Sequence, residues 1–118
     1  MTDSSADAAD QRTRLDRRIR DAEELVATLE LERAAMVEAS SASNADDEHD
    51  PEGATIAFER AQLDATIAEV RLRRVELTAA VERVDAGTYG FCVICGLPIP
   101  AERLEARPSA TTHVACAP

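Results

Sequence analysis

Two short pairs of metal-binding residues stand near the end of the chain. Cys92 and Cys95 form the first pair, His113 and Cys116 form the second, and residues 96–112 separate them. Each pair places its ligands at positions i and i+3, so a tight turn can aim both donors at one point. All three cysteines of the chain belong to this pattern. The spacing predicts one zinc ion with four protein ligands, which is a closed, structural site and not a catalytic one.

A redox-active or disulfide pair is the alternative interpretation of Cys92 and Cys95. A cytosolic C-x-x-C redox motif expects a βαβ context, and a secreted disulfide framework expects an even cysteine count and an export signal. The chain has three cysteines and no apolar segment near its start. Zinc is therefore the favoured interpretation, and the histidine ligand predicts loss of the metal at mildly acidic pH.

The composition restricts the class of protein. Only 3% of the 118 residues are aromatic, and the formal net charge is −10. So few aromatic residues cannot fill a large globular core. No stretch approaches the roughly 20 apolar residues that span a bilayer, so we expect a soluble, cytoplasmic protein. The negative charge argues against duplex DNA as the principal ligand, because basic side chains supply most of the affinity for phosphates. A protein partner is expected.

Two apolar stripes at heptad spacing predict a long antiparallel helical hairpin over residues 11–87. Residues 1–10 are small, polar and acidic and are expected to form a disordered tail, with helical order beginning near Gln11. Polar residues at 41–53 interrupt the pattern and predict a turn, which we call the acidic tip. The first stripe comprises Leu15, Ile19, Ala22, Val26, Leu29 and Met36, with Arg33 in the missing position. The second comprises Ile56, Leu63, Ile67, Val70, Leu77, Val81 and Val84.

The zinc ligands follow this hairpin directly. Gly87 is expected to end the second helix, because glycine readily adopts the left-handed conformation. Residues 88–118 are expected to form the zinc finger, with a short helix opened by Pro100. The predicted fold class is mainly α, a long antiparallel two-helix coiled-coil hairpin with a small C-terminal zinc-finger lobe.

Two further patterns mark the predicted helix surfaces. The second helix carries an opposite apolar stripe that a two-helix hairpin leaves uncovered; dimerisation, a partner and a solvent-exposed alanine face are open interpretations. Its members are Phe58, Ala61, Ala65, Ala68, Leu72, Val75 and Ala79. Five arginines near the start of the first helix form either a solvated face or a docking patch for an acidic surface. They are Arg12, Arg14, Arg17, Arg18 and Arg20.

The acidic tip concentrates carboxylates around His49. They belong to Asp46, Asp47, Glu48, Asp50 and Glu52. At the end of a long hairpin, such a cluster can approach a bound magnesium ion or a basic loop inside another protein. The same residues suit a helix start, because Asp50 is a good N-cap before Pro51 and acidic residues favour a helix N-terminus. The two interpretations are compatible.

The motifs around the cysteines resemble the DksA/TraR zinc-finger transcription factors. They are Gly87-Thr88-Tyr89-Gly90-Phe91-Cys92, Cys95-Gly96, Ile99-Pro100 and Arg103-Leu104-Glu105-Ala106-Arg107-Pro108, ending at Cys116. These motifs are specific, and the predicted hairpin extends the likeness over most of the chain. The run from Asp46 to Gly53 is similar to the version found in actinobacterial members.

The resemblance implies a protein that is not an enzyme but a transcription regulator. Such a protein binds bacterial RNA polymerase, inserts its coiled coil through the secondary channel and alters open-complex stability without binding DNA directly. The resemblance also implies that His113 stands where the family usually has cysteine among the zinc ligands. A monomer is expected rather than a homodimer. The competing hypotheses are a zinc-stapled coiled-coil adaptor or dimerisation protein and, third, a nucleic-acid-binding zinc ribbon.

The acidic tip departs from the family motif Asp-x-x-Asp-x-Ala, and two registers are available. Asp47 and Asp50 keep both acids but put Glu52 where alanine belongs. Counting back from the zinc cysteines without a gap selects His49, Glu52 and Ala54 instead. The resemblance further implies that Arg107 is a candidate contact with polymerase or with guanosine tetraphosphate, and that dependence on this nucleotide is weak or absent.

Overall fold

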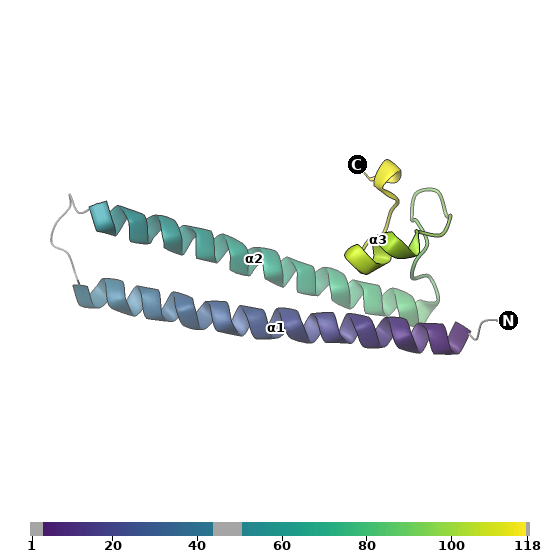
Figure 1. Ribbon diagram of the computed structural model, residues 1–118, viewed down its shortest axis with the longest axis horizontal. Coiled ribbons are helices and arrows are strands. Elements are labelled where there is room, and N and C mark those ends of the chain that lie inside the picture. Colours follow the sequence, from purple (N-terminus) through teal and green to yellow (C-terminus); the bar gives the residue numbers. More distant parts are fainter. Residues whose placement is uncertain (1–3, 44–50, 118) are drawn as a thin grey trace. The chain divides into compact units, whose positions relative to one another are not determined.

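The computed structural model describes residues 4–43 and 51–117, and these residues are mainly helical. Helix α1 comprises Ser4–Ser43, α2 comprises Pro51–Ala86, α3 comprises Ala101–Ala106, and a 3-10 helix, η1, comprises Val114–Cys116. Figure 1 shows α1 and α2 as the two long elements, with α3 in the C-terminal segment. Helices α1 and α2 pack as a hairpin, which confirms the predicted fold class.

The residues group into two compact units, one of Met1–Arg20 with Arg74–Pro118 and one of Asp21–Arg73. Within the described ranges, no helix is both long enough and apolar enough to span a membrane.

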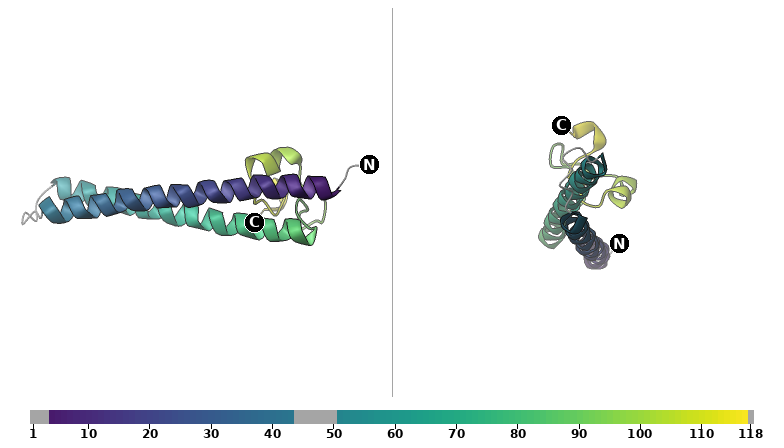
Figure 2. Two further views of the ribbon diagram at one scale, coloured as in Figure 1. Left: turned by 90° about the horizontal axis from the view of Figure 1, so that it is seen from below. Right: turned by 90° about the vertical axis from the view of Figure 1, so that its left-hand side faces the viewer.

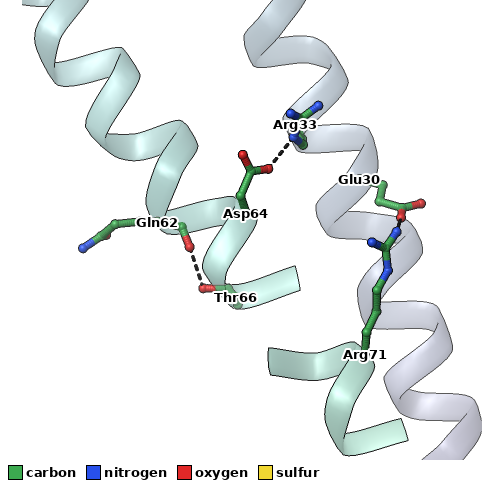
Figure 3. A network of polar contacts seen from close by, with 6 residues as sticks. All are labelled: Glu30, Arg33, Gln62, Asp64, Thr66 and Arg71. Atoms are coloured by element: carbon green, nitrogen blue, oxygen red, sulfur yellow. Dashed lines mark hydrogen bonds and ion pairs between the residues drawn. The ribbon is translucent and has the colours of Figure 1, made fainter. Parts of the chain in front are cut away.

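The unit of Asp21–Arg73 is a pair of antiparallel helical segments. Glu30 forms an ion pair with Arg71, and Arg33 forms one with Asp64 (Figure 3). The residue numbers rise along α1 while those of the partners fall along α2, so the helices run in opposite directions. All four side chains are about half exposed, so each pair contributes about 0.2–1 kcal/mol at most. The ion pair explains why Arg33 occupies a position of the apolar stripe.

The unit of Met1–Arg20 with Arg74–Pro118 holds the described apolar cluster that joins α1 to α2. Its buried members are Leu15, Leu77, Ala80 and Val84, and Ala8, Ile19, Val81 and Tyr89 pack against them. A polar contact accompanies the cluster, since Arg12 donates a hydrogen bond of 2.7 Å to Asp85. This unit also contains the cysteines and histidine of the predicted zinc site.

The prediction that helical order begins near Gln11 is wrong, because α1 begins at Ser4. Ala8 packs against the apolar cluster formed with α2. Removing even a methyl group from water is favourable, so contact with α2 stabilises extra helical turns that the polar composition does not predict. Residues 1–3 lie outside the described part of the chain.

The two stripes of α2 differ sharply in burial. The predicted inner stripe supplies Ile67, Val70, Leu77 and Val84, all of them buried. The opposite stripe is exposed from Phe58 to Val75, with 62% of Phe58, 58% of Leu72 and 62% of Val75 accessible to solvent. This difference agrees with the expectation that a two-helix hairpin covers only one face of each helix.

Helix α2 ends where the sequence predicts. Gly87 adopts a φ of 78°, in the left-handed region. The amide of Gly87 donates to the carbonyl of Val84, and the amide of Thr88 donates to the carbonyl of Arg83. These bonds satisfy carbonyls of the last helical turn, and the chain then turns directly into the segment that carries Cys92.

Candidate metal centre

A tight turn positions Cys92 and Cys95. The amide of Gly96 donates to the Cys92 carbonyl at 2.9 Å, and the amide of Cys92 donates to the Leu97 carbonyl at 2.9 Å. Gly96 has a φ of 76°, which favours glycine at this position. Within the described chain, the one isolated β-bridge joins Phe91 and Pro98 on either side of the turn. The turn therefore holds both thiols on one side of a short closed loop.

The second ligand pair lies on the final 3-10 turn. His113 precedes η1, and the amide of Cys116 donates to the His113 carbonyl at 3.0 Å. The loop between the pairs returns to the first turn, because the amide of Val93 donates to the Thr111 carbonyl at 2.9 Å. This backbone contact brings the two pairs together.

The four predicted ligands form one compact cluster. The donor atoms of Cys92, Cys95, His113 and Cys116 all lie within 4.8 Å of one another. Cys95 Sγ lies 3.3 Å from His113 Nδ1. Three thiols and one imidazole are the donor types that zinc prefers, and four such donors close its tetrahedral coordination. The cluster therefore fits one zinc ion by both chemistry and compactness.

The backbone also selects the histidine nitrogen that faces the cluster. His113 Nε2 lies 2.8 Å from the carbonyl oxygen of Pro98. A carbonyl only accepts hydrogen bonds, so Nε2 carries the proton and donates it. In the neutral ring, Nδ1 then keeps its lone pair and points toward Cys95, as a metal ligand requires.

The surroundings of the thiols in the cluster shift the pKa values of Cys92 and Cys116 in opposite directions. Burial raises the pKa of the Cys92 thiol, but backbone hydrogen bonds and the His113 ring lower it to about 5 overall. Ile94 N contributes one of these bonds, at 3.4 Å from Cys92 Sγ. Burial and the neighbouring sulfurs of Cys92 and Cys95 raise the pKa of Cys116 to about 11. A divalent cation removes this conflict, because it replaces protons and neutralises converging thiolates.

Polar side chains bond to backbone carbonyls of the zinc lobe, and one of them, Arg83, reaches the lobe from α2. The Tyr89 hydroxyl donates to the Pro108 carbonyl at 2.8 Å. Arg83 donates to the Ser109 carbonyl at 3.4 Å, and Arg103 donates to the Thr112 carbonyl at 2.6 Å. The sequence does not indicate these partners or the Pro98 carbonyl, because backbone acceptors leave no residue-type signal.

Arg107 is exposed and lies beside two other arginines. It lines a cavity of about 370 Å³ together with Arg83 and Arg103. The other two guanidinium groups donate to carbonyls of the zinc lobe, so their positions have a structural cause. The predicted role of Arg107 in binding a nucleotide or polymerase stays a prediction.

Most of the acidic tip lies outside the described residues. This applies to Asp46, Asp47 and Asp50, and to the side chain of Glu52. Ala54 lies in α2 and is exposed. The roles predicted for these residues therefore stay predictions.

Comparison with known proteins identifies the zinc lobe. Residues 87–118 match the family model of the prokaryotic dksA/traR C4-type zinc finger. The uncharacterized protein YteA of Bacillus subtilis is 38% identical over 66 residues, which are 56% of this chain and 28% of that protein. The RNA polymerase-binding transcription factor DksA of Caulobacter vibrioides is 49% identical over 39 residues, which are 33% of this chain and 28% of that protein.

The helices and zinc lobe together are similar to a solved structure, that of transcription factor DksA2 from Pseudomonas aeruginosa. The TM-score is 0.76 at 21% identity, and the match covers 93% of this chain and 79% of that one. The likeness shows the same fold. The chain spans only 28% of the length of each of the two curated relatives named above.

The matched family is of the C4 type, whereas this chain offers three cysteines and His113. The cluster keeps four donors, and the prediction of a zinc ion is confirmed. The zinc-finger match, the compact ligand cluster and the shared fold lead to one conclusion: residues 87–118 form a zinc finger of the prokaryotic dksA/traR type, in a chain with the same fold as transcription factor DksA2.

Proposed function

We propose that this protein regulates transcription by binding bacterial RNA polymerase. The helical hairpin enters the secondary channel, and the acidic tip acts near the catalytic centre to change the stability of promoter open complexes. The protein acts by binding and catalyses no reaction, in the bacterial cytoplasm where the polymerase works. The observation that carries the proposal is the combination of a DksA/TraR zinc lobe with two long antiparallel helices in one chain.

The contacts of the zinc lobe give it a structural role in this proposal. Tyr89 packs on the cluster formed by Leu15, Leu77 and Val84, while its hydroxyl bonds to Pro108 in the zinc loop. The lobe and the adjoining helix ends thus support one another. When bound, zinc supplies the cross-link between the two ligand pairs, and four protein ligands leave it no open position for substrate.

The lifetime of open complexes tests the proposal. Cognate RNA polymerase is assembled on a ribosomal RNA promoter with the native protein or with Asp50→Asn/Glu52→Gln, which removes two tip carboxylates. We expect the native protein to change the lifetime and the tip variant to lose most of that effect, because the carboxylates supply the charge that acts inside the channel.

A matched variant separates the acidic tip from general acidity. Glu32→Gln/Glu38→Gln removes the same charge from exposed positions of α1, and we expect this variant to act like the native protein. A native protein without effect on the lifetime argues against the proposal. Equal loss of activity in both variants assigns the effect to net charge and not to the acidic tip.

The exposed stripe of α2 favours a second candidate, a zinc-stapled coiled-coil adaptor or dimerisation protein. Phe58, Leu72 and Val75 are each more than half exposed, and they share the heptad spacing of a helix–helix seam. Sedimentation equilibrium distinguishes the candidates. We expect a monomer whose mass Phe58→Ser/Val75→Ser does not change, whereas a dimer that the variant dissociates supports the adaptor.

We also propose that Arg107 contacts polymerase or guanosine tetraphosphate. We propose that dependence on the nucleotide is weak. Titration of the nucleotide into the polymerase complex, with native protein and with Arg107→Ala, measures this contribution. Strong nucleotide binding that the variant abolishes argues against weak dependence.

A further inference from the structure

A groove lies between the N-terminal part of α1 and α3, outside the zinc ligands and the acidic tip. It has a volume of about 390 Å³, near the lower end of ligand pockets in proteins. Leu15, Tyr89 and Leu104 supply apolar surface, and Pro108 lies beside them. Figure 2 places α3 alongside this part of α1, and a contact of 3.5 Å from Arg18 to the Glu105 carbonyl joins the two helices.

Three arginines give the groove a basic edge. Arg14, Arg17 and Arg18 follow the spacing i, i+3 and i+4, so they project from one face of α1. Glu105 is the single acidic residue among the lining residues. Arg18 reaches the Glu105 carbonyl, but Arg14 and Arg17 are exposed and make no ion pair or hydrogen bond with another described residue.

The balance of charge in this groove is opposite to that of the whole chain. The protein has 23 acidic and 13 basic residues, yet three arginines and one acidic residue line the groove. An anionic ligand is therefore complementary to the groove. Because Leu15, Tyr89 and Leu104 form an apolar surface in the groove, a complementary ligand also carries an apolar group beside its negative charge.

A peptide meets both requirements better than a nucleic acid does. The volume accommodates one or two large side chains, and the arginines that line the groove can pair with carboxylates that flank such side chains. A nucleic acid would instead extend over neighbouring surface, and the net charge of −10 repels its phosphates.

We propose that this groove binds an acidic peptide segment of a partner protein. The segment inserts an apolar side chain between Tyr89 and Leu104 and places carboxylates against Arg14 and Arg17. Guanidinium groups form charge-assisted hydrogen bonds with carboxylates, often in a bidentate arrangement. The inference does not rest on the proposed function, since it concerns residues distant in sequence from the acidic tip and is tested without polymerase.

Fluorescence anisotropy with designed peptides tests the groove. The probe is a labelled peptide of about 15 residues that carries leucines flanked by glutamates. We expect saturable binding of the probe to the zinc-loaded protein, weakening with added salt because charge drives it. A second probe with lysine in place of glutamate should not bind.

Three variants locate the binding site. Arg14→Gln/Arg17→Gln should weaken binding about tenfold, as expected for losing two partly exposed charge pairs. Arg20→Gln/Arg73→Gln removes the same charge from exposed arginines outside the groove and should leave binding unchanged. Ala101→Phe keeps the charge but narrows the groove, and it should also weaken binding. Circular dichroism and zinc content confirm that each variant is folded.

Four results with the peptide probes would overturn the proposal. These are absence of binding by the glutamate probe, equal binding of the lysine probe, equal weakening by both double arginine variants, and undiminished binding by Ala101→Phe. Saturable binding of a labelled single-stranded or duplex DNA that competes with the glutamate probe would also overturn it, in favour of a phosphate-binding groove. The open-complex assay reports on the acidic tip independently, so failure of either proposal is recognised separately.

Discussion

The hydrogen bond between His113 and Pro98 makes zinc binding at this residue sensitive to pH. The Pro98 carbonyl raises the pKa of His113 above its ordinary value, and the hydrogen bond with Cys92 raises it further. Because Nε2 already donates to Pro98, the additional proton binds Nδ1, the nitrogen that faces the cluster. Protons and zinc therefore compete for one atom, and the apparent zinc affinity falls as the pH drops through this pKa.

Replacing His113 tests this competition. We expect His113→Ala to bind zinc more than about 100-fold more weakly at neutral pH, since even outer-sphere partners of metal ligands are worth 10–100-fold. Zinc binding to the variant should also release about one proton fewer between about pH 7 and 5, so its affinity should depend less steeply on pH. Competition with a chromophoric chelator measures both quantities. His49→Ala, which changes the chain's other histidine, is the control, and an unchanged pH slope in His113→Ala would contradict the assignment.

Tyr89 allows a second measurement at the scale of one residue, because it is the single tyrosine of a chain without tryptophan. Burial raises the pKa of its phenol, and the charges of Arg14 and Arg83 oppose that shift only in part. A raised pKa favours the neutral form in the folded state, so the associated stability is full below the unfolded pKa of about 10 and is lost as the pH rises through the folded value. In an absorbance titration at alkaline pH, the phenol of the folded protein should ionise at a higher pH than that of a denatured sample. Titration curves that coincide would contradict this prediction.

Losing the Tyr89 hydroxyl should destabilise the zinc lobe modestly. Tyr89→Phe keeps the ring but leaves the Pro108 carbonyl without its donor at 2.8 Å. We expect a loss of about 0.5–1.5 kcal/mol in the free energy of unfolding, measured by urea denaturation of the zinc-loaded protein. Phe91→Leu, at a position that is 49% exposed, serves as the control. An unchanged free energy in Tyr89→Phe would mean that water replaces the hydroxyl at no cost.

At the scale of elements, the two long helices and the zinc lobe should respond differently to removal of the metal. The lobe buries few side chains, among them Cys92, Ile99 and Ala110, and structural zinc typically supplies about 10–16 kcal/mol to such small modules. Chelation should unfold residues 88–116 and allow trypsin to cleave the chain after Arg103. Helices α1 and α2 have 40 and 36 residues, against six in α3, so helical circular dichroism should change little. Unaltered protease resistance after chelation would contradict this prediction.

A pair of leucines on α2 tests which of its faces carries the folding energy. Leu77 is 3% exposed within the cluster that includes Leu15, whereas Leu72 is 58% exposed. Leu77→Ala should lower the free energy of unfolding by about 2–5 kcal/mol through lost burial and a cavity. Leu72→Ala, the same change on the exposed face, should cost less than about 0.5 kcal/mol. A large cost at Leu72 would indicate that another surface covers this stripe in solution.

At the scale of the whole molecule, periodicity predicted much of the fold and spacing predicted the ligand cluster. Both signals are carried by residue types, as with Ile67 and Val70 on the buried face of α2. The start of α1 was missed because Ala8 gains its stabilisation from α2, which local composition does not report. The hydrogen bond of Tyr89 was missed because its acceptor is a backbone carbonyl, and every residue offers one.

The net charge of −10 makes a prediction about the intact protein and nucleic acid. Binding to duplex DNA requires several guanidinium or ammonium groups on phosphates, and each contact steepens the salt dependence. Here Arg12 is paired with Asp16 and Asp85, Arg33 with Asp64, and Arg71 with Glu30, so acidic neighbours already neutralise part of the basic set. We expect no saturable binding to a labelled promoter duplex, even at low salt, in an anisotropy titration without polymerase. Binding whose affinity falls steeply with salt would instead support a nucleic-acid-binding zinc ribbon, and its loss on chelation would place the contact in the zinc lobe.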